Sequence, residues 1–169
     1  NISKRIGQSS ELALTLNSYS GFFLTFSFFK KALSCNKKAM EIQKKLKNQW
    51  GIARTHQTIG FIYQYQAEYD KSIESLSKSI EIFEKIGDLR ELGISLYLLS
   101  QNYYYAGDYK KSSEINTRYM ELFNQTKDNY GISGSLAGLA KMAIEKGSLD
   151  EAEGFIQTGL ELSEENQLW

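Results

Sequence analysis

The sequence has no proline, a single cysteine and a single histidine in 169 residues. Without proline, the strongest helix breaker is missing, which favours an all-helical chain whose turns are made by glycines and polar dipeptides. The lone cysteine, Cys35, cannot form an internal disulfide bond, as is typical of a reducing compartment, so we predict a cytoplasmic location. One histidine with one cysteine makes none of the usual zinc ligand sets, and we expect no metal and no cofactor.

Long apolar runs are also missing. The longest, residues 21–29, is interrupted by Thr25 and Ser27. It is shorter than the roughly 18 apolar residues that a membrane-spanning helix needs, so none is predicted. The chain begins at Asn1 with neither a methionine nor a charged and then apolar leader. These features predict an excerpt of a longer protein.

A forty-residue period runs through the chain, and small and large residues recur at fixed places in it. Three sets of positions keep the period: Phe29, Tyr69, Tyr109 and Leu149; Ser20, Gly60, Ser100 and Ala140; Ala32, Ser72, Ser112 and Ala152. A period of about 20 to 50 residues is the signature of a repeat architecture, in which each unit buries its apolar face against its neighbours. The pattern predicts one domain over residues 1–169 with four helix-turn-helix repeats, at about 10–48, 49–87, 88–127 and 128–165.

Each repeat is predicted to hold two amphipathic helices. Their expected ranges are about 10–26, 29–47, 49–66, 69–86, 88–106, 109–126 and 128–146, with an eighth helix that ends near Glu164. Residues 1–8 show no periodic pattern and are expected to fray. Asp88 and Glu91 match a capping box at a helix start, and Asp128, forty residues after Asp88, is expected to cap the next repeat. Ala67 is expected at a close approach of two helices.

The repeat unit resembles the tetratricopeptide repeat, a family defined by small and large residues at fixed offsets in a helix pair. The residues that carry the resemblance in the second unit are Ile59, Gly60, Tyr63, Ala67, Tyr69, Ser72, Leu76, Ser79 and Ile80. The period exceeds the family's usual one of about 34 residues, and the proline that often closes a unit is absent, which implies longer helices. The resemblance implies an all-α, right-handed solenoid of helix-turn-helix repeats that binds peptides on its concave side.

In the family that the chain resembles, the first helix of each pair lines the concave groove. Helical spacing then gives the candidate groove residues as those opposite the buried face: Asn17, Arg54, Gln57, Phe61, Gln64, Tyr65, Tyr97, Gln101, Tyr104, Tyr105 and Lys141. The glutamines can donate to and accept from a peptide backbone, and the aromatic residues add rigid contact area. The alternative is that some of the aromatic side chains only pack between helices. With Arg54 and Lys141 as the only cations in the set, a carboxylate clamp of several basic residues is not expected.

A stripe of lysines follows the second predicted helix. The stripe consists of Lys30, Lys31, Lys37, Lys38, Lys44 and Lys45. Two trios repeat every seven residues, nearly two helical turns, so each trio lies on one side of the helix. The favoured interpretation is a solvated outer face; the alternative is a basic ridge for nucleic acid, acidic lipid headgroups or an acidic partner. No aromatic residues interleave with these lysines to stack on bases. Since the solvated face is the favoured interpretation, we expect neither nucleic acid nor membrane binding.

Charge is distributed unevenly along the chain. Residues 1–54 contain ten Lys or Arg and two acidic residues, a net charge of +8, whereas residues 129–169 contain two basic and seven acidic residues, a net charge of −5. Opposite charges at the two ends could favour head-to-tail association. We predict a monomer or weak self-association.

Nothing in the sequence indicates catalysis. His56 occupies the place of a large interior residue in the repeat, which is typical of a packed histidine, and Cys35 lies away from it. No glycine-rich phosphate loop follows a strand, because no strand is predicted. We therefore predict that the chain is not an enzyme but a protein interaction module, a sensor or regulatory arm that binds a peptide or partner segment in its groove. The alternative is a structural, self-associating scaffold without a peptide ligand.

Overall fold

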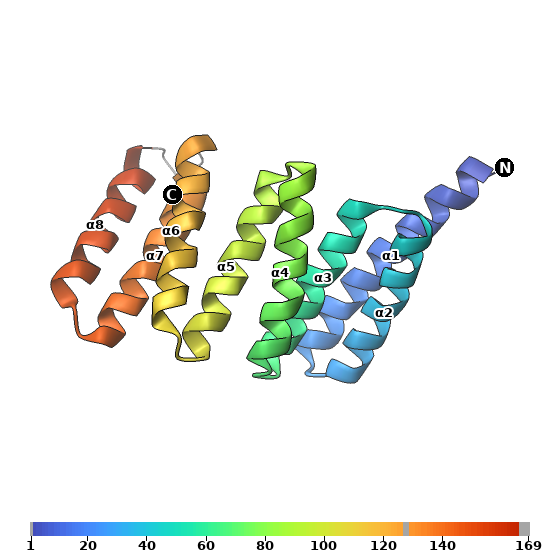
Figure 1. Cartoon of the computed structure of the whole chain (residues 1–169), viewed down its shortest axis with the longest axis horizontal. Coiled ribbons are helices and arrows are strands. Elements are labelled where there is room, and N and C mark those ends of the chain that lie inside the picture. The colour runs from blue at the N-terminus through green and yellow to red at the C-terminus, as the bar shows by residue number, and fades with distance from the viewer. Residues whose placement is uncertain (1, 127–128, 166–169) are drawn as a thin grey trace. The chain divides into compact units, whose positions relative to one another are not determined.

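The computed structural model describes the backbone of residues 2–126 and 129–165, and the side chains of residues 9–122, 136–161 and 164. All its regular elements in these ranges are helices, which confirms the all-helical prediction (Figure 1). They are α1 (Ile2–Thr25), α2 (Phe29–Lys45), α3 (Gln49–Tyr65), α4 (Tyr69–Ile86), α5 (Leu89–Tyr105), α6 (Tyr109–Thr126), α7 (Asn129–Lys146) and α8 (Leu149–Glu165).

The helix boundaries follow the predicted ones within two residues, with one exception. Helix α1 begins at Ile2, so the expectation that residues 1–8 fray is wrong for the residues that the structure describes. The physical reason is that extending a formed helix fixes one residue for each hydrogen bond gained, and no proline interrupts the segment. The predicted cap Asp128 lies outside the described residues.

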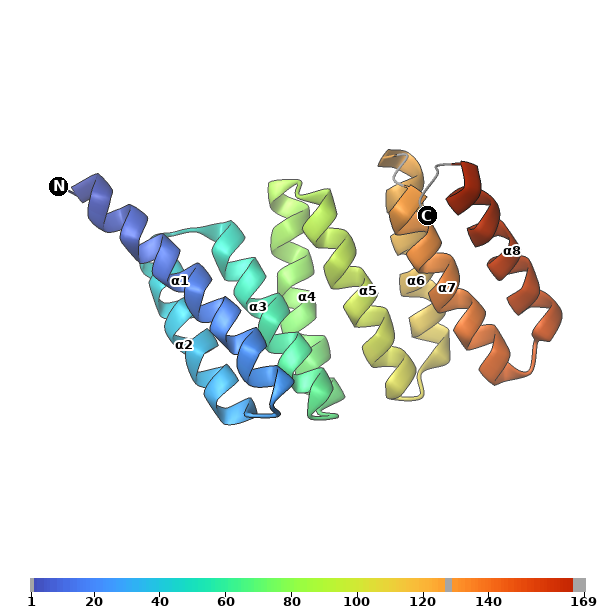
Figure 2. The same cartoon turned by 180° about the vertical axis from the view of Figure 1, so that it is seen from behind.

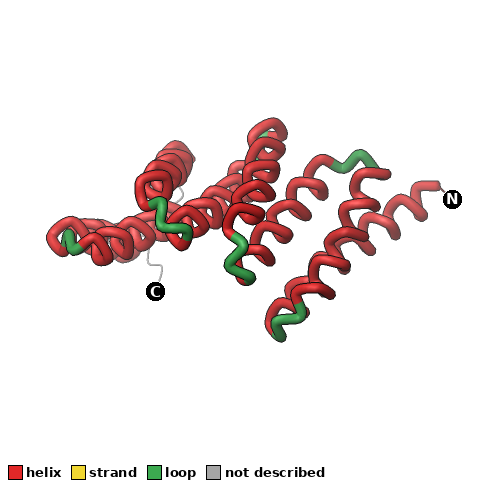
Figure 3. The backbone as a smooth tube through the Cα atoms, turned by 60° about the horizontal axis from the view of Figure 1, so that its bottom comes forward, coloured by secondary structure: helices red, strands yellow, loops and turns green. Residues whose placement is uncertain are grey.

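The helices end at turns that recur every twenty residues (Figure 3). The left-handed positions, with φ between 52° and 84°, are Ser27, Lys47, Ala67, Gly87, Gly107 and Gly147. At Ala67, the next N–H, that of Glu68, donates to the carbonyl of Tyr63 at 2.9 Å, and Asp108 N does the same to Tyr103 O at 2.9 Å. Such bonds are those of the helix C-terminal motif that favours glycine. Ala67 therefore lies in the turn between the two helices, where the predicted ranges place it, but it is exposed, so its expected part in a close helix–helix contact is wrong.

The turn at Ala67 gives a first prediction. Ala67→Gly is expected to raise the free energy of unfolding by about 1 kcal/mol, because glycine adopts the left-handed conformation without the steric cost of a Cβ atom. The matched change is Gly107→Ala, where the added Cβ meets no atom within 4 Å and only the backbone cost remains. It is expected to lower that free energy by about 1 kcal/mol. Urea titrations followed by circular dichroism measure both; equal changes of the same sign would contradict the account.

The chain divides into two compact units, Asn1–Ser95 and Leu96–Trp169, and each has its own core. The prediction of one continuous domain over residues 1–169 stays a prediction. In the first unit, α1 pairs with α2 and α3 with α4, while α1 and α3 also contact each other (Figure 2). The first helices of the two pairs thus form one layer of this unit.

The core of the first unit depends on small residues at the repeat positions. Ser72 Oγ donates to Gly60 O at 2.7 Å, across the α3–α4 hairpin. Gly60, Ser72 and Ser79 are buried, as the repeat pattern predicts. Leu76 packs directly over Gly60, where it leaves no room for a Cβ atom. Close approach of the two helices therefore requires glycine at position 60.

The core of the second unit repeats the same contact. Ser112 Oγ donates to Ser100 O at 2.9 Å across the α5–α6 turn, and both serines are buried. Beside them, Tyr104, Leu139 and Met142 form an apolar cluster against which Phe155 packs. The equivalence of positions forty residues apart thus extends from the sequence to the hydrogen bonds.

Candidate functional site

In the first unit, the candidate groove residues do not all lie on an open face. Gln57 is only 2% exposed, and its Nε2 donates to Ser95 Oγ at 2.9 Å and to Glu91 O at 3.2 Å. Its side chain therefore fastens α3 to the start of α5. The sequence placed Gln57 on the face open to a ligand, and the structure corrects this, because the next repeat supplies polar partners that cover the amide.

Arg54 belongs to the same polar network. Its Nη1 donates to Glu91 Oε2 at 3.0 Å and also to Gln57 Oε1. The Arg54 side chain is 39% exposed, so one edge of the guanidinium still faces solvent. The cation is thus partly neutralised within the chain, which leaves Arg54 a weaker candidate for an anionic ligand than the sequence suggested.

The predicted capping box at the start of α5 forms only by half. Asp88 Oδ1 accepts the backbone N–H of Glu91 at 3.1 Å, as predicted. The Glu91 carboxylate turns to Arg54, while Asp88 Oδ2 accepts from Trp50 Nε1 at 2.9 Å. The partners of both acids lie at least 37 residues away in sequence, so local spacing gave no signal for Trp50.

The other candidates of the first unit keep accessible surface. Asn17 and Gln64 are half-buried, and Asn17 Nδ2 lies 3.4 Å from Thr55 Oγ1. Phe61 and Tyr65 stack edge to face with ring centroids 4.9 Å apart, and Tyr65 is exposed. These four residues form the part of the predicted face that remains available in this unit.

In the second unit, the structure brings Lys141 onto two tyrosines. Lys141 Nζ lies 4.8 Å from the ring centroid of Tyr104 and 5.1 Å from that of Tyr105. Tyr105 is 47% exposed, whereas Tyr104 is 7% exposed and belongs to the core cluster with Leu139 and Met142. The prediction of Tyr104 as an open groove residue is therefore corrected: its face supports Lys141, and its edge is buried by α7.

Tyr97 and Gln101 complete the candidate surface on α5. Tyr97 is exposed and its ring centroid lies 6.2 Å from that of Tyr119, while Gln101 is half-buried. No carboxylate of the described residues lies within ion-pair distance of Lys141. The surface thus combines an ammonium group fixed by aromatic rings, one amide and exposed aromatic area.

His56 is the single histidine of the sequence and lies on α3. Burial, with further effects of Lys78 and Lys44, lowers the pKa of His56, which is half-buried. Among the described residues, no group of three or more His, Cys, Asp or Glu side chains could hold a metal ion. Within the same residues, every helix is too short or too polar to cross a membrane.

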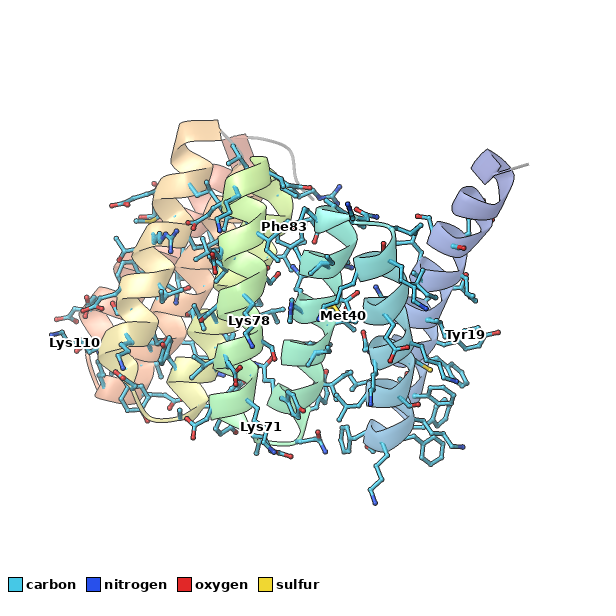
Figure 4. The ribbon with its side chains drawn as sticks, turned by 45° about the vertical axis from the view of Figure 1, so that its right-hand side comes forward. Tyr19, Met40, Lys71, Lys78, Phe83 and Lys110 are labelled. Atoms are coloured by element: carbon cyan, nitrogen blue, oxygen red, sulfur yellow. The ribbon has the colours of Figure 1, made fainter. Side chains whose placement is uncertain are left out.

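The lysine stripe of α2 is exposed along its whole length. The corresponding lysines of α4 are paired instead: Lys78 Nζ lies 2.5 Å from Glu74 Oε1, and Lys85 Nζ lies 2.6 Å from Glu81 Oε1. Figure 4 marks Lys71 and Lys78 on α4. Each of these pairs joins residues four apart in one helix, a spacing that favours ion pairs, so the charge of α2 is the less balanced of the two.

The sequence of the central part of the chain is similar to a known family. Residues 51–125 match the family model described as tetratricopeptide repeat. A comparison with curated proteins finds no match in sequence.

Solved structures of tetratricopeptide-like proteins share the fold. Aspartyl phosphate phosphatase F from Bacillus subtilis superposes with a TM-score of 0.85 at 14% identity, over 94% of this chain and 42% of that protein. A Rap protein complexed with competence and sporulation factor gives 0.74 at 17% identity, over 90% and 43%. A putative kinesin light chain from Podospora anserina with TPR-like repeats gives 0.72 at 15% identity, over 98% and 77%.

The predicted fold class, an all-α solenoid of tetratricopeptide-like repeats, is confirmed by these likenesses. The chain spans less than half the length of the phosphatase and of the Rap protein. Sequence identities of 14–17% show that these proteins share a fold with this chain, and they show nothing beyond the fold.

Proposed function

We propose that this protein interaction module binds an extended segment of a protein partner on the face of its first-of-pair helices. The observation that carries the proposal is Lys141, whose ammonium group is held over Tyr104 and Tyr105 and has no acidic partner among the described residues. A cation fixed in this way is suited to a carboxylate of a bound segment, either an acidic side chain or a chain terminus.

The neighbouring groups suit the rest of such a segment. Tyr105 and Tyr97 offer exposed, rigid aromatic area, and tyrosine is enriched where binding energy is concentrated. Gln101 can both donate to and accept from a peptide backbone. Because the rings already hold Lys141, little side-chain freedom is lost on binding, which lowers the ordering cost. In the first unit, Asn17, Phe61, Gln64 and Tyr65 offer the same combination of amides and aromatic rings.

A peptide selection tests this proposal. A random peptide library is selected on the 169-residue protein and, in parallel, on a Gln101→Ala, Tyr105→Ala, Lys141→Gln variant. We expect an enriched motif with an acidic group and a loss of affinity of about tenfold or more in the variant, since truncation of central interface residues costs at least about 1.4 kcal/mol.

The matched control is Lys111→Gln. Lys111 Nζ also lies over a tyrosine ring, 5.2 Å from the centroid of Tyr103, but on α6 and outside the proposed surface. This variant is expected to bind as the wild type does. If no motif is enriched, or if the triple variant stays helical and binds equally well, the proposed surface is not the site.

A self-associating scaffold is the second candidate, and exposed apolar residues on α1 and α8 favour it. Tyr19 points away from α1 into solvent, although Leu99, its equivalent eighty residues later, is buried (Figure 4). Ile156 on α8 is likewise exposed, whereas its equivalent Leu76 is fully buried. Sedimentation velocity over a range of concentrations distinguishes the candidates, because a monomer at all concentrations excludes this one.

A further inference from the structure

The turn between α1 and α2 carries a cluster of exposed phenylalanines. Phe26 is 58% exposed and Phe28 is 51% exposed. Their rings stack with centroids 6.3 Å apart, and the ring of Phe22, also exposed, lies 5.1 Å from that of Phe26. We call Phe26 and Phe28, with Lys30 and Lys31 that follow them, the first tip. Both phenylalanines are exposed at the turn, and neither lines the neighbouring pocket, which is formed by Thr15, Ser18, Tyr19 and Phe22.

The first tip differs from the equivalent turns of the other repeats. Phe28 is the N-cap residue of α2, and this helix has no side-chain capping bond. The residues that stand in its place forty, eighty and 120 positions later are Glu68, Asp108 and Ser148. Asp108 caps α6, since its Oδ1 accepts the N–H of Lys111 at 3.1 Å. Phenylalanine cannot accept a hydrogen bond, so Phe28 provides no cap where Asp108 does; Glu68, the N-cap residue of α4, also makes no side-chain capping bond.

Phe26 is equally unusual at its position. Its equivalents Gln66, Ala106 and Lys146 are polar or small, and Ala106 and Lys146 are exposed. Phe26 therefore stands at a turn position that is also exposed at Ala106 and Lys146, whereas the equivalents of Phe28, namely Glu68, Asp108 and Ser148, are half-buried. Turn positions usually hold polar or small residues, and residues that depart from such a preference without stabilising the fold are expected mainly at functional sites.

The charge around the first tip is of one sign. Four lysines and no acidic residue occur between Glu11 and Glu41. Lys31 Nζ lies 5.1 Å from the ring centroid of Phe28 and 5.7 Å from that of Phe23, so a cation sits directly on the aromatic cluster. The neighbouring turn of the same unit, by contrast, carries Glu68 and Asp70. Only the first tip combines protruding aromatic rings with unopposed positive charge in this unit.

We infer that the first tip docks the protein on an anionic lipid surface, with Phe26 and Phe28 inserted at the headgroup boundary and Lys30 and Lys31 contacting lipid phosphates or carboxylates. Exposed aromatic rings are stabilised when they insert into an apolar environment, and a bilayer interface provides one without a complementary pocket. The flanking ammonium groups add attraction to acidic headgroups at the same depth. An acidic peptide would instead require a recess on this chain to hold it.

The positions of the lysines along α2 determine how strongly each is attracted to the lipid surface. Lys37 and Lys38 lie about 10 Å further along the helix than Lys30 and Lys31, and Lys44 and Lys45 lie about 20 Å further, from the rise of about 1.5 Å per residue. Charges beyond a Debye length of about 8 Å are largely screened at physiological salt. Lys30 and Lys31 therefore dominate when the tip is inserted, and Lys44 with Lys45 provides a control with the same change of charge.

The test is co-sedimentation of the 169-residue protein with vesicles of phosphatidylcholine alone and with about 30% phosphatidylserine, at physiological salt. We expect binding only to the anionic vesicles. Phe26→Ser with Phe28→Ser, and separately Lys30→Gln with Lys31→Gln, are each expected to weaken it by about tenfold or more, and Lys44→Gln with Lys45→Gln by less than about threefold. Serine at position 28 can cap α2, so the phenylalanine variant keeps its helical signal and its peptide binding.

Insertion is measured separately with a Phe28→Trp variant and brominated lipids. Its fluorescence in excess of the wild-type signal is expected to shift to shorter wavelength and to be quenched on anionic vesicles, whereas Trp50, near the opposite end of α2, is not expected to be quenched. The proposal is overturned if the serine variant binds as the wild type does, if the new tryptophan is not quenched, or if the two lysine-pair variants weaken binding equally. It is also overturned if soluble polyglutamate binds with the same dependence on Phe26 and Phe28 while vesicles do not.

Discussion

Replacing Phe83 with alanine is expected to lower the free energy of unfolding by about 3–5 kcal/mol. Phe83 on α4 is the largest of the side chains that the structure buries completely. Its removal deletes the buried ring and leaves a cavity that the surrounding helices can close only in part. The change also adds a good helix former, but this gain is well under 1 kcal/mol. Chemical denaturation followed by circular dichroism measures the loss.

The control for Phe83 lies three residues later on the same helix. Ile86→Ala removes an apolar side chain that is already substantially exposed. Since little surface is returned to water, its effect is expected to stay below about 1 kcal/mol. A loss at Phe83 no greater than that at Ile86 would mean that the ring does not anchor the core of the first unit.

A second large effect is expected at Gly60. Gly60→Ala is predicted to lower the free energy of unfolding by about 1–3 kcal/mol, because overpacking a tight contact forces backbone and side chains to move. The added Cβ atom meets Leu76 Cγ at 2.7 Å and the backbone oxygen of Ser72 at 3.3 Å. Leu76 is fully buried and cannot turn away. Thermal and urea unfolding measure the change.

Gly21→Ala isolates the contact from helix propensity. Gly21 is also within a helix, α1, but a Cβ atom there meets nothing within 4 Å. Alanine at position 21 is therefore expected to stabilise the protein by roughly 0.5–1 kcal/mol. Opposite signs for the two glycines support the steric account. If Gly60→Ala stabilised the protein as well, the two helices could not be in close contact at this point.

The chain carries two proposed binding surfaces, one around Lys141 and one at the first tip. Face residues such as Lys141 suit a carboxylate of a protein segment, whereas the first tip suits an anionic lipid surface. The two proposals are independent, because the serine variant at Phe26 and Phe28 leaves Lys141 and its tyrosines untouched. Each of the experiments can therefore fail without affecting the other.

Much of the fold could be predicted from the sequence because the determining interactions are local or repeated. Helix positions follow from periodic apolar residues, and Gly60 with Ser72 could be assigned to the helix contact from the forty-residue spacing alone. The pairs of Lys78 with Glu74 and of Lys85 with Glu81 depend only on a four-residue separation in one helix. The turn at Ala67 was predicted, but its left-handed conformation was not, since no glycine marks it.

The candidate site was predicted only in part. Helical spacing gives the direction in which a side chain points, but it does not show whether residues of a neighbouring helix bury that side chain. Gln57 points to the predicted face and is nevertheless buried by groups of α5. Tyr104 is covered by residues of α7, and the cation that rests on its ring is 37 residues away in the sequence.

The sequence by itself determined the helical content, the period, the turns marked by glycine and the small residues at helix contacts. These follow from backbone preferences and from side-chain spacing within one repeat. Only the tertiary structure decided which polar groups find partners in the next repeat, which tyrosines support Lys141, and which phenylalanines of the first hairpin are buried or protrude. Each of these depends on surfaces brought together across turns, and their contacts leave no periodic trace in a single chain.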